Sequence, residues 1–301
     1  AQDPRADVED DLEAALERDP FFAEAYLESA AYWVRRGKPE PALEALEQAA
    51  ELLPGSPLVS LYWAQAFYAQ GDFEQALEYG ELALEQDLTL LAAYRAAGLA
   101  AAAQEKYPRA IQLLKTYLAF EPDDPAATLS LGRAYLDSGA TRLALAAFDQ
   151  ALAQDETLIE AVLYRGLAYL KLGKGQEAVN DLLLARKEGG RTFQVELALG
   201  QALSLAERLE DARGQMRAAE NLAETDEDLA QVAYHRAQIN EALEDIPAAV
   251  QDWKDLLALD EQAVSSAWRA LAGERLEALA TPTPTLTATP TRTPTRTLAP
   301  T

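Results

Sequence analysis

The stretch ATLSLGRAYLDSGATRLALAAFDQALAQD, residues 127–155, decides the fold because its apolar residues follow two helical periods with a glycine between them. Leu131 and Tyr135 share one face of the first segment, and Ala144 and Phe148 share one face of the second. A glycine that follows a helix can adopt the left-handed conformation without strain, so it marks a turn. We therefore predict a hairpin of two helices.

The hairpin recurs along the chain, which indicates a repeat architecture. One series of alanines has a spacing of 34 residues, with 37 before its last member: Ala42, Ala76, Ala110, Ala144, Ala178, Ala212 and Ala249. A second series of small residues lies 12 positions before the first: Ala30, Ala64, Gly98, Gly132, Gly166, Gly200 and Ala237. Small residues on two helices let the backbones approach closely, and a larger side chain would overpack the contact at roughly 1–3 kcal/mol. We expect the two series to join the helices of each hairpin.

Turn residues separate the expected helices. Four hairpins have a glycine at the turn and three have a glutamate there: Gly37, Gly71, Gly139 and Gly173, then Glu105, Glu207 and Glu244. Proline cannot continue a helix, and three prolines follow the expected ends of second helices: Pro20, Pro54 and Pro122.

Residues 25–54, AYLESAAYWVRRGKPEPALEALEQAAELLP, and residues 127–155 resemble the helix-turn-helix consensus of the tetratricopeptide repeat almost throughout. The resemblance implies an all-α fold, a right-handed α-solenoid of about seven repeats with an N-terminal half-repeat helix and a C-terminal capping helix. We expect Trp268 of the capping helix to turn inward. The expected domains are the N-terminal helix in 1–22, seven repeats in 23–263 (starts near 23, 57, 91, 125, 159, 193 and 230), the capping helix in 264–280 and a Thr/Pro-rich extended tail in 281–301.

Some positions depart from the repeat pattern. Polar residues stand where the repeat is usually apolar, and a glycine stands where a large core residue is usual: Arg165, Glu196, Arg236 and Asn240, then Gly80. We expect weaker packing near the last two repeats. The three extra residues lie near the acidic stretch 224–228, which we expect to form an extended connection that alters the stacking angle.

The charge of the chain excludes several classes of partner. The formal net charge is −24, and no basic stripe is present to neutralise phosphates, so nucleic acid and anionic lipid headgroups are not expected partners. The chain has no cysteine, which excludes disulfides and thiolate chemistry. No run of 18 apolar residues is present, so we expect no insertion into a membrane.

The resemblance also implies a binding surface, because tetratricopeptide proteins usually bind extended peptides along outward positions of the first helices. Mapped onto this chain, these positions give a largely apolar partner groove: Leu27, Leu58, Leu61, Tyr68, Leu99, Leu129, Leu136, Leu163, Leu167 and Leu170. Each of these leucines could instead pack between repeats. Members of the family that read acidic chaperone tails use Lys, Arg and Asn, whereas this groove offers mainly Arg95, Arg133 and Lys171. A chaperone adapter is therefore disfavoured.

Nothing in the sequence indicates an enzyme. The one histidine, His235, lies mid-helix, where we expect a structural or surface role. No paired histidines, phosphate-binding glycine loop or nucleophile elbow occurs. We expect no catalytic, cofactor-binding or metal-binding residues, and covalent glycans are the one non-protein group considered.

Residues 281–301, TPTPTLTATPTRTPTRTLAPT, resemble the O-glycosylated stalks of secreted and cell-surface bacterial proteins. An unmodified spacer is the alternative. The candidate O-glycosylation sites are Thr281, Thr283, Thr285, Thr287, Thr289, Thr291, Thr293, Thr295, Thr297 and Thr301. Both interpretations favour an extracellular or cell-surface location, and the Ala-Gln start is compatible with a removed signal peptide as well as with a trimmed chain.

Two hypotheses about function follow. In the first, the chain is a self-assembling structural subunit of a filament, through a head-to-tail contact or by docking its tail in the groove of a second copy. In the second, the chain is a monomeric adapter, exposed on the cell envelope, that binds an extended partner peptide in its concave groove.

Overall fold

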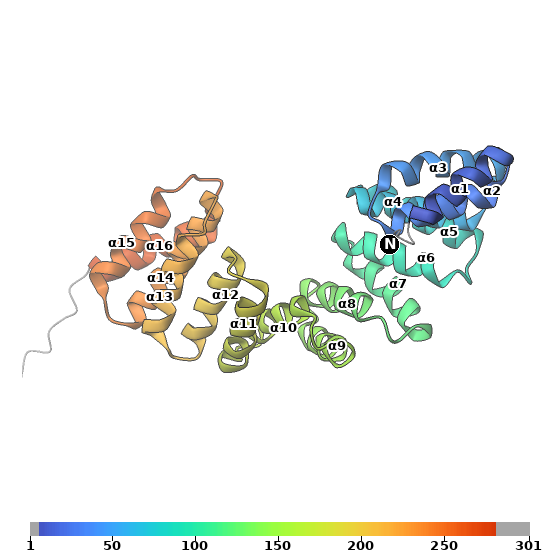
Figure 1. Cartoon of the computed structure of the whole chain (residues 1–301). Coiled ribbons are helices and arrows are strands. Elements are labelled where there is room, and N and C mark those ends of the chain that lie inside the picture. Colours follow the sequence, from blue (N-terminus) through green and yellow to red (C-terminus); the bar gives the residue numbers. More distant parts are fainter. Residues whose placement is uncertain (1–5, 281–301) are drawn as a thin grey trace, which may run out of the picture. The chain divides into compact units, whose positions relative to one another are not determined.

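The computed structural model describes residues 6–280, and these residues form sixteen helices and no strand. The predicted all-α fold is confirmed (Figure 1). The helices are α1 Ala6–Arg18, α2 Ala23–Arg35, α3 Pro39–Leu52, α4 Pro57–Gln70, α5 Phe73–Gln86, α6 Leu91–Ala103, α7 Tyr107–Phe120, α8 Pro125–Asp137, α9 Thr141–Gln154, α10 Ile159–Lys171, α11 Gly175–Gly189, α12 Phe193–Leu205, α13 Leu209–Glu220, α14 Asp226–Ala242, α15 Ile246–Ala258 and α16 Ser266–Ala280.

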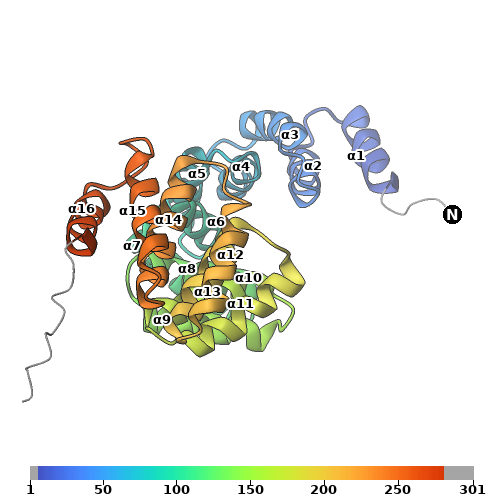
Figure 2. The same cartoon turned by 90° about the vertical axis from the view of Figure 1, so that its left-hand side faces the viewer.

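The chain divides into two compact units, with the boundary between Arg208 and Leu209. The first unit contains α1 to α12, and the second contains α13 to α16. In the first unit, the pairs α2/α3, α4/α5, α6/α7, α8/α9 and α10/α11 form antiparallel hairpins (Figures 1 and 2). The first helix of each hairpin also packs on the first helix of the next, as α4 does on α6. Neighbouring hairpins therefore complete each other's core, as a repeat array requires.

The small residues of the repeat are buried at the contact between the two helices of a hairpin. Ala42, Ala110 and Ala144 have no exposed surface. A Cβ atom added to Gly132 would lie 2.5 Å from Cε1 of Phe148. The residue facing each glycine is thus a large side chain 16 positions later rather than the alanine 12 positions later, which corrects the expected pairing. The physical reason is that a glycine provides the space that a leucine or phenylalanine fills.

The hairpin turns share one hydrogen-bond pattern. At Gly139 the amide donates to the carbonyl of Leu136, and the next amide, of Ala140, donates to the carbonyl of Tyr135. This is the Schellman arrangement, in which the turn residue has a positive φ. Glu105, with φ 59°, uses the same conformation at the α6/α7 turn, although a side chain is disfavoured there.

The polar residues at usually apolar positions have charged partners. Arg165 in α10 pairs with Asp181 in α11, at 2.7 Å from Nε to Oδ2, and its Nη1 lies 2.9 Å from Oδ1 of Asp149 in α9. Glu196 in α12 is fully buried and accepts a hydrogen bond from Nε of Arg191 at 2.5 Å. These positions therefore use ionic contacts in place of apolar packing.

Gly80 has a different explanation. A Cβ atom there would lie 2.9 Å from Cβ and 3.0 Å from Cα of Ala97. The glycine therefore lets α5 and α6 approach each other closely. Three stacked rings, Trp63, Phe67 and Tyr79, lie at centroid distances of 5.4 to 5.5 Å in the same hairpin.

The second unit is built on the α14/α15 hairpin, on which α13 and α16 pack. Its core includes Trp253, with 1% of its surface exposed, and the ring of Trp268 in α16 stacks on Tyr234 at 4.3 Å. Arg236 pairs with Asp252 at 2.7 Å from Nε to Oδ1, and Nδ2 of Asn240 donates to Oδ2 of the same aspartate at 2.6 Å.

The expectation of an extended connection in the acidic stretch is wrong. Residues 226–228 form the first turn of α14, which begins at Asp226 rather than near 230. Thr225 caps this helix: its hydroxyl accepts from the amide of Asp228, and the Asp228 carboxylate accepts from the amide of Thr225. Carboxylates at a helix N-terminus are favoured by the helix dipole, which explains why this acidic stretch is helical. The extra residues lengthen a helix.

Candidate functional site

A hollow of about 440 Å³ lies on the first unit, where successive first helices α4, α6 and α8 come together. Its lining comes from these helices and from the turns and second helices that follow them. The lining residues are Tyr68, Phe73, Leu99, Ala102, Ala103, Glu105, Tyr107, Ser130, Arg133, Ala134 and Asp137.

The apolar part of the hollow is aromatic. Tyr68 lies at the end of α4 and Phe73 begins α5, so the turn at Gly71 brings their rings to a centroid distance of 5.3 Å at a tilt of 57°. Nε2 of Gln104 donates to the carbonyl of Phe73 at 2.5 Å, which ties the next turn to this one. Two hairpin turns thus hold the aromatic side chains in place.

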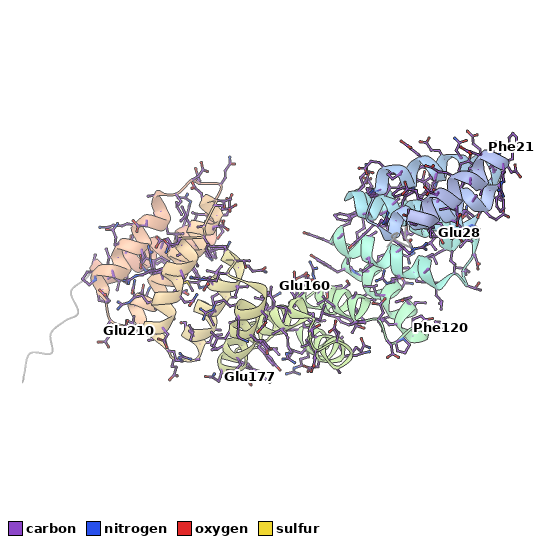
Figure 3. All side chains as sticks on the ribbon, in the orientation of Figure 1. Phe21, Glu28, Phe120, Glu160, Glu177 and Glu210 are labelled. Carbon is purple, nitrogen blue, oxygen red and sulfur yellow. The ribbon has the colours of Figure 1, made fainter. Side chains whose placement is uncertain are left out.

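The polar part of the hollow contains both signs of charge. Nη1 of Arg133 lies 3.0 Å from Oε1 of Glu160, which Figure 3 labels on α10, and the guanidinium lies 4.7 Å from the ring centroid of Tyr164. Burial raises the pKa of the Tyr107 phenol, and the carboxylates of Asp137 and Glu105 raise it further, while Arg133 acts in the opposite direction. The Tyr107 hydroxyl therefore lies within the field of all three charged groups.

Comparison with known families identifies the repeat. A family model described as tetratricopeptide repeat matches residues 9–57, 34–89, 61–125 and 129–191, and a second model of the same description matches residues 101–155. The chain belongs to the tetratricopeptide repeat family. No curated protein matches the chain.

Solved structures show the same fold at low sequence identity. A tetratricopeptide repeat protein from Parabacteroides merdae is 18% identical, with a TM-score of 0.55 over 85% of this chain and 98% of that one. The structure of the APC/C hetero-tetramer Cut9-Hcn1 gives 16% identity and a TM-score of 0.61 over 90% of this chain and 51% of that one. PilF from Pseudomonas aeruginosa gives 21% identity and a TM-score of 0.56 over 68% and 93%. These likenesses concern the fold alone.

The tetratricopeptide scaffold places the ten predicted groove residues in three different environments. The buried ones are Leu27, Leu61, Leu129 and Leu136, the half-buried ones are Leu99, Leu163, Leu167 and Leu170, and the exposed ones are Leu58 and Tyr68. Leu129 and Leu136 belong to one core cluster with Ala161 and Ala168 of α10, so neighbouring first helices cover them. Tyr68 and Leu99 meet in the hollow.

The three cations of the predicted groove all have partners. Nε of Arg95 lies 2.7 Å from Oδ2 of Asp124, and Nζ of Lys171 donates to the carbonyl of Leu136 at 3.1 Å. Arg133 has Glu160 and Tyr164, as described above. Partners of this kind make these cations poorly available to hold a carboxylate.

Sequence reasoning missed Phe73, Glu105, Tyr107 and Asp137 as lining residues. They lie at the ends of first helices, in the turns or at the starts of second helices, outside the positions that the family resemblance supplies. The signal that could have found them is the pair of aromatics that directly follow two consecutive turns, Phe73 and Tyr107.

Several further predictions concern other parts of the chain. The candidate O-glycosylation residues lie outside the described residues 6–280. Within these residues no group of His, Asp and Glu is arranged to hold a metal ion, and the described helices include none long and apolar enough to cross a membrane. His235 is half-buried in α14, beside the ring of Tyr234.

Proposed function

We propose that this tetratricopeptide repeat protein is a non-enzymatic scaffold that holds an extended segment of a partner protein across the hollow between α4, α6 and α8. The observation that supports this proposal most is the meeting of Tyr68 and Leu99 in one concavity. Both residues belong to the outward face that the family uses for peptides, and they come from different repeats.

The hollow has the size and character of a side-chain pocket. About 440 Å³ accommodates one or two large side chains, and aromatic walls provide apolar contact area at a small entropy cost. The scaffold holds the walls by core packing, since α4, α6 and α8 contact one another through residues such as Ala64, Ala97 and Ala134. Little ordering is then needed on the scaffold side when a peptide binds.

A selection of displayed peptides against the full chain, followed by calorimetry, tests this proposal. Leu99→Asp places a charge in the hollow and should weaken binding of a selected peptide at least tenfold, which is about 1.4 kcal/mol. Leu143→Asp is the matched control, because Leu143 is 54% exposed and does not line the hollow. Equal affinity of both variants for the peptide would show that the hollow is not the site.

The location and the state of assembly are separate proposals that rest on the composition of residues 281–301. Threonine at each odd position from 281 to 297, interleaved with proline, supports a glycosylated, surface-exposed or secreted protein. An intact mass equal to that of the bare polypeptide from the native source would contradict glycosylation. Between the two functional hypotheses we favour the adapter, because the hollow supports it. Regular fibres that disappear on deletion of residues 281–301 would favour the filament instead.

A further inference from the structure

The carboxylates that line the hollow have no cationic partner. Glu105 and Asp137 are both exposed, and among the described residues neither side chain has an ion pair or a hydrogen bond. The single lining cation, Arg133, is paired with Glu160 and covers the ring of Tyr164. The hollow therefore presents two uncompensated negative charges next to its aromatic wall.

The response of Tyr107 agrees with this account. Burial, Asp137 and Glu105 together raise the pKa of its phenol, although Arg133 opposes them. The hydroxyl at the rim of the hollow thus experiences a net negative field. A cation placed at the rim would experience the same field as an attraction.

Glu105 occupies its position in spite of the backbone. Its φ of 59° is the left-handed conformation that Gly37, Gly71, Gly139 and Gly173 adopt at the equivalent turns. A carboxylate just past a helix C-terminus also opposes the helix dipole. Glu207 and Glu244 share the conformation, so the turn alone does not distinguish Glu105. What distinguishes Glu105 is that its side chain lines an aromatic hollow.

We infer that the hollow binds a segment in which a large apolar side chain lies next to a lysine or arginine. The apolar side chain enters between Tyr68, Phe73, Leu99 and Tyr107, and the neighbouring cation pairs with Glu105 and Asp137. This inference rests on the proposed function and adds the chemistry of the partner. The net charge of −24 favours approach of such a segment over an acidic one.

The test uses the full chain and three acetylated, amidated peptides that differ only in charge, with the cores Phe-Lys-Leu-Lys, Phe-Gln-Leu-Gln and Phe-Glu-Leu-Glu. Calorimetry should show the lysine peptide binding best and the glutamate peptide worst, and raising the salt concentration should reduce the difference. The variant Glu105→Gln/Asp137→Asn should weaken binding of the lysine peptide about tenfold and leave the glutamine peptide unchanged.

The matched control is Glu47→Gln/Glu51→Gln on α3, which removes the same charge from exposed residues away from the hollow. Lysine-peptide affinity that falls equally in both double variants would overturn the inference, because the effect would then come from the overall charge. Equal or tighter binding of the glutamate peptide would also overturn it. Leu99→Asp separates the two levels: if it weakens all three peptides while the charge preference is missing, the site is correct and the partner chemistry is wrong. If it weakens none, the proposed function itself fails.

Discussion

Arg165 and Asp181 form a two-pronged ion pair, with Nε 2.7 Å from Oδ2 and Nη2 2.9 Å from Oδ1. The same arrangement recurs in the second unit between Arg236 and Asp252. In both cases the arginine occupies a first-helix position that is usually apolar, and a second acid on the preceding second helix, Asp149 or Glu220, also contacts it. Repetition of all three elements indicates a structural unit and not an isolated surface contact.

Replacing Arg165 with methionine should destabilise the first unit by about 2–4 kcal/mol, because Asp181 would stay in the core without a counterion. The Asp181 side chain is only 11% exposed. Urea denaturation followed by circular dichroism measures the change. The double variant Arg165→Met/Asp181→Leu should recover most of the loss, and an Arg165→Met protein as stable as the wild type would contradict this account.

Replacing Gly132 with alanine should cost about 1–3 kcal/mol by overpacking against the Phe148 ring, which cannot move aside easily. Gly273→Ala in α16 is the control: no atom lies within 4 Å of the added Cβ, so the gain in helix propensity should stabilise by about 0.5–1 kcal/mol. Differential scanning calorimetry of both variants gives the comparison. Equal effects of the two substitutions would show that the hairpin contact tolerates a methyl group.

Acidification should destabilise the second unit through His235. Burial lowers the pKa of this imidazole to about 4, below its unfolded value of 6.5. The unfolded chain therefore binds the proton first, so the contribution is intact above pH 6.5 and is lost as the pH falls from 6.5 towards 4. The loss should reach about 2–3 kcal/mol at its lower limit. The difference in unfolding free energy between wild type and His235→Gln, measured from pH 7 to pH 4.5, isolates this term, and a pH-independent difference would contradict it.

Replacing Glu105 with glycine should stabilise the first unit by about 0.5–1 kcal/mol, because the left-handed conformation costs a glycine nothing. The same variant should weaken binding of the lysine peptide. Glu244→Gly should stabilise its own unit by a similar amount without changing peptide affinity, since Glu244 does not line the hollow. Melting temperatures and calorimetric titrations of the two variants measure both effects.

The sequence alone was sufficient for the fold, because its periodicity is physical at each level. Ala42 and Ala144 could be assigned to the core since a spacing of 34 residues places them at the same point of successive hairpins. Gly37 and Glu105 could both be assigned to turns by position, although the positive φ of a glutamate could not be read from its chemistry.

The candidate site was less predictable. Position within a repeat gives the face of a helix, but it does not tell whether the next repeat covers that face, so Leu61 and Leu136 are buried where an open groove was expected. The partner of Arg165 was also missed, although acids at 16 residues on either side of it were visible. Ionic contacts between helices depend on which side chains meet, and apolar periodicity contains no information about them.

The outer surface of α16 has a consequence for any end-to-end association. Its exposed residues include Ser266, Ala267, Ala270 and Glu274, while Trp268 and Ala272 face the α14/α15 hairpin. A further hairpin would find only short or charged side chains there and nothing greasy to grip. Termination of the array at this edge is thus written into the residues that face water, and any higher-order growth must begin from some other surface of the molecule.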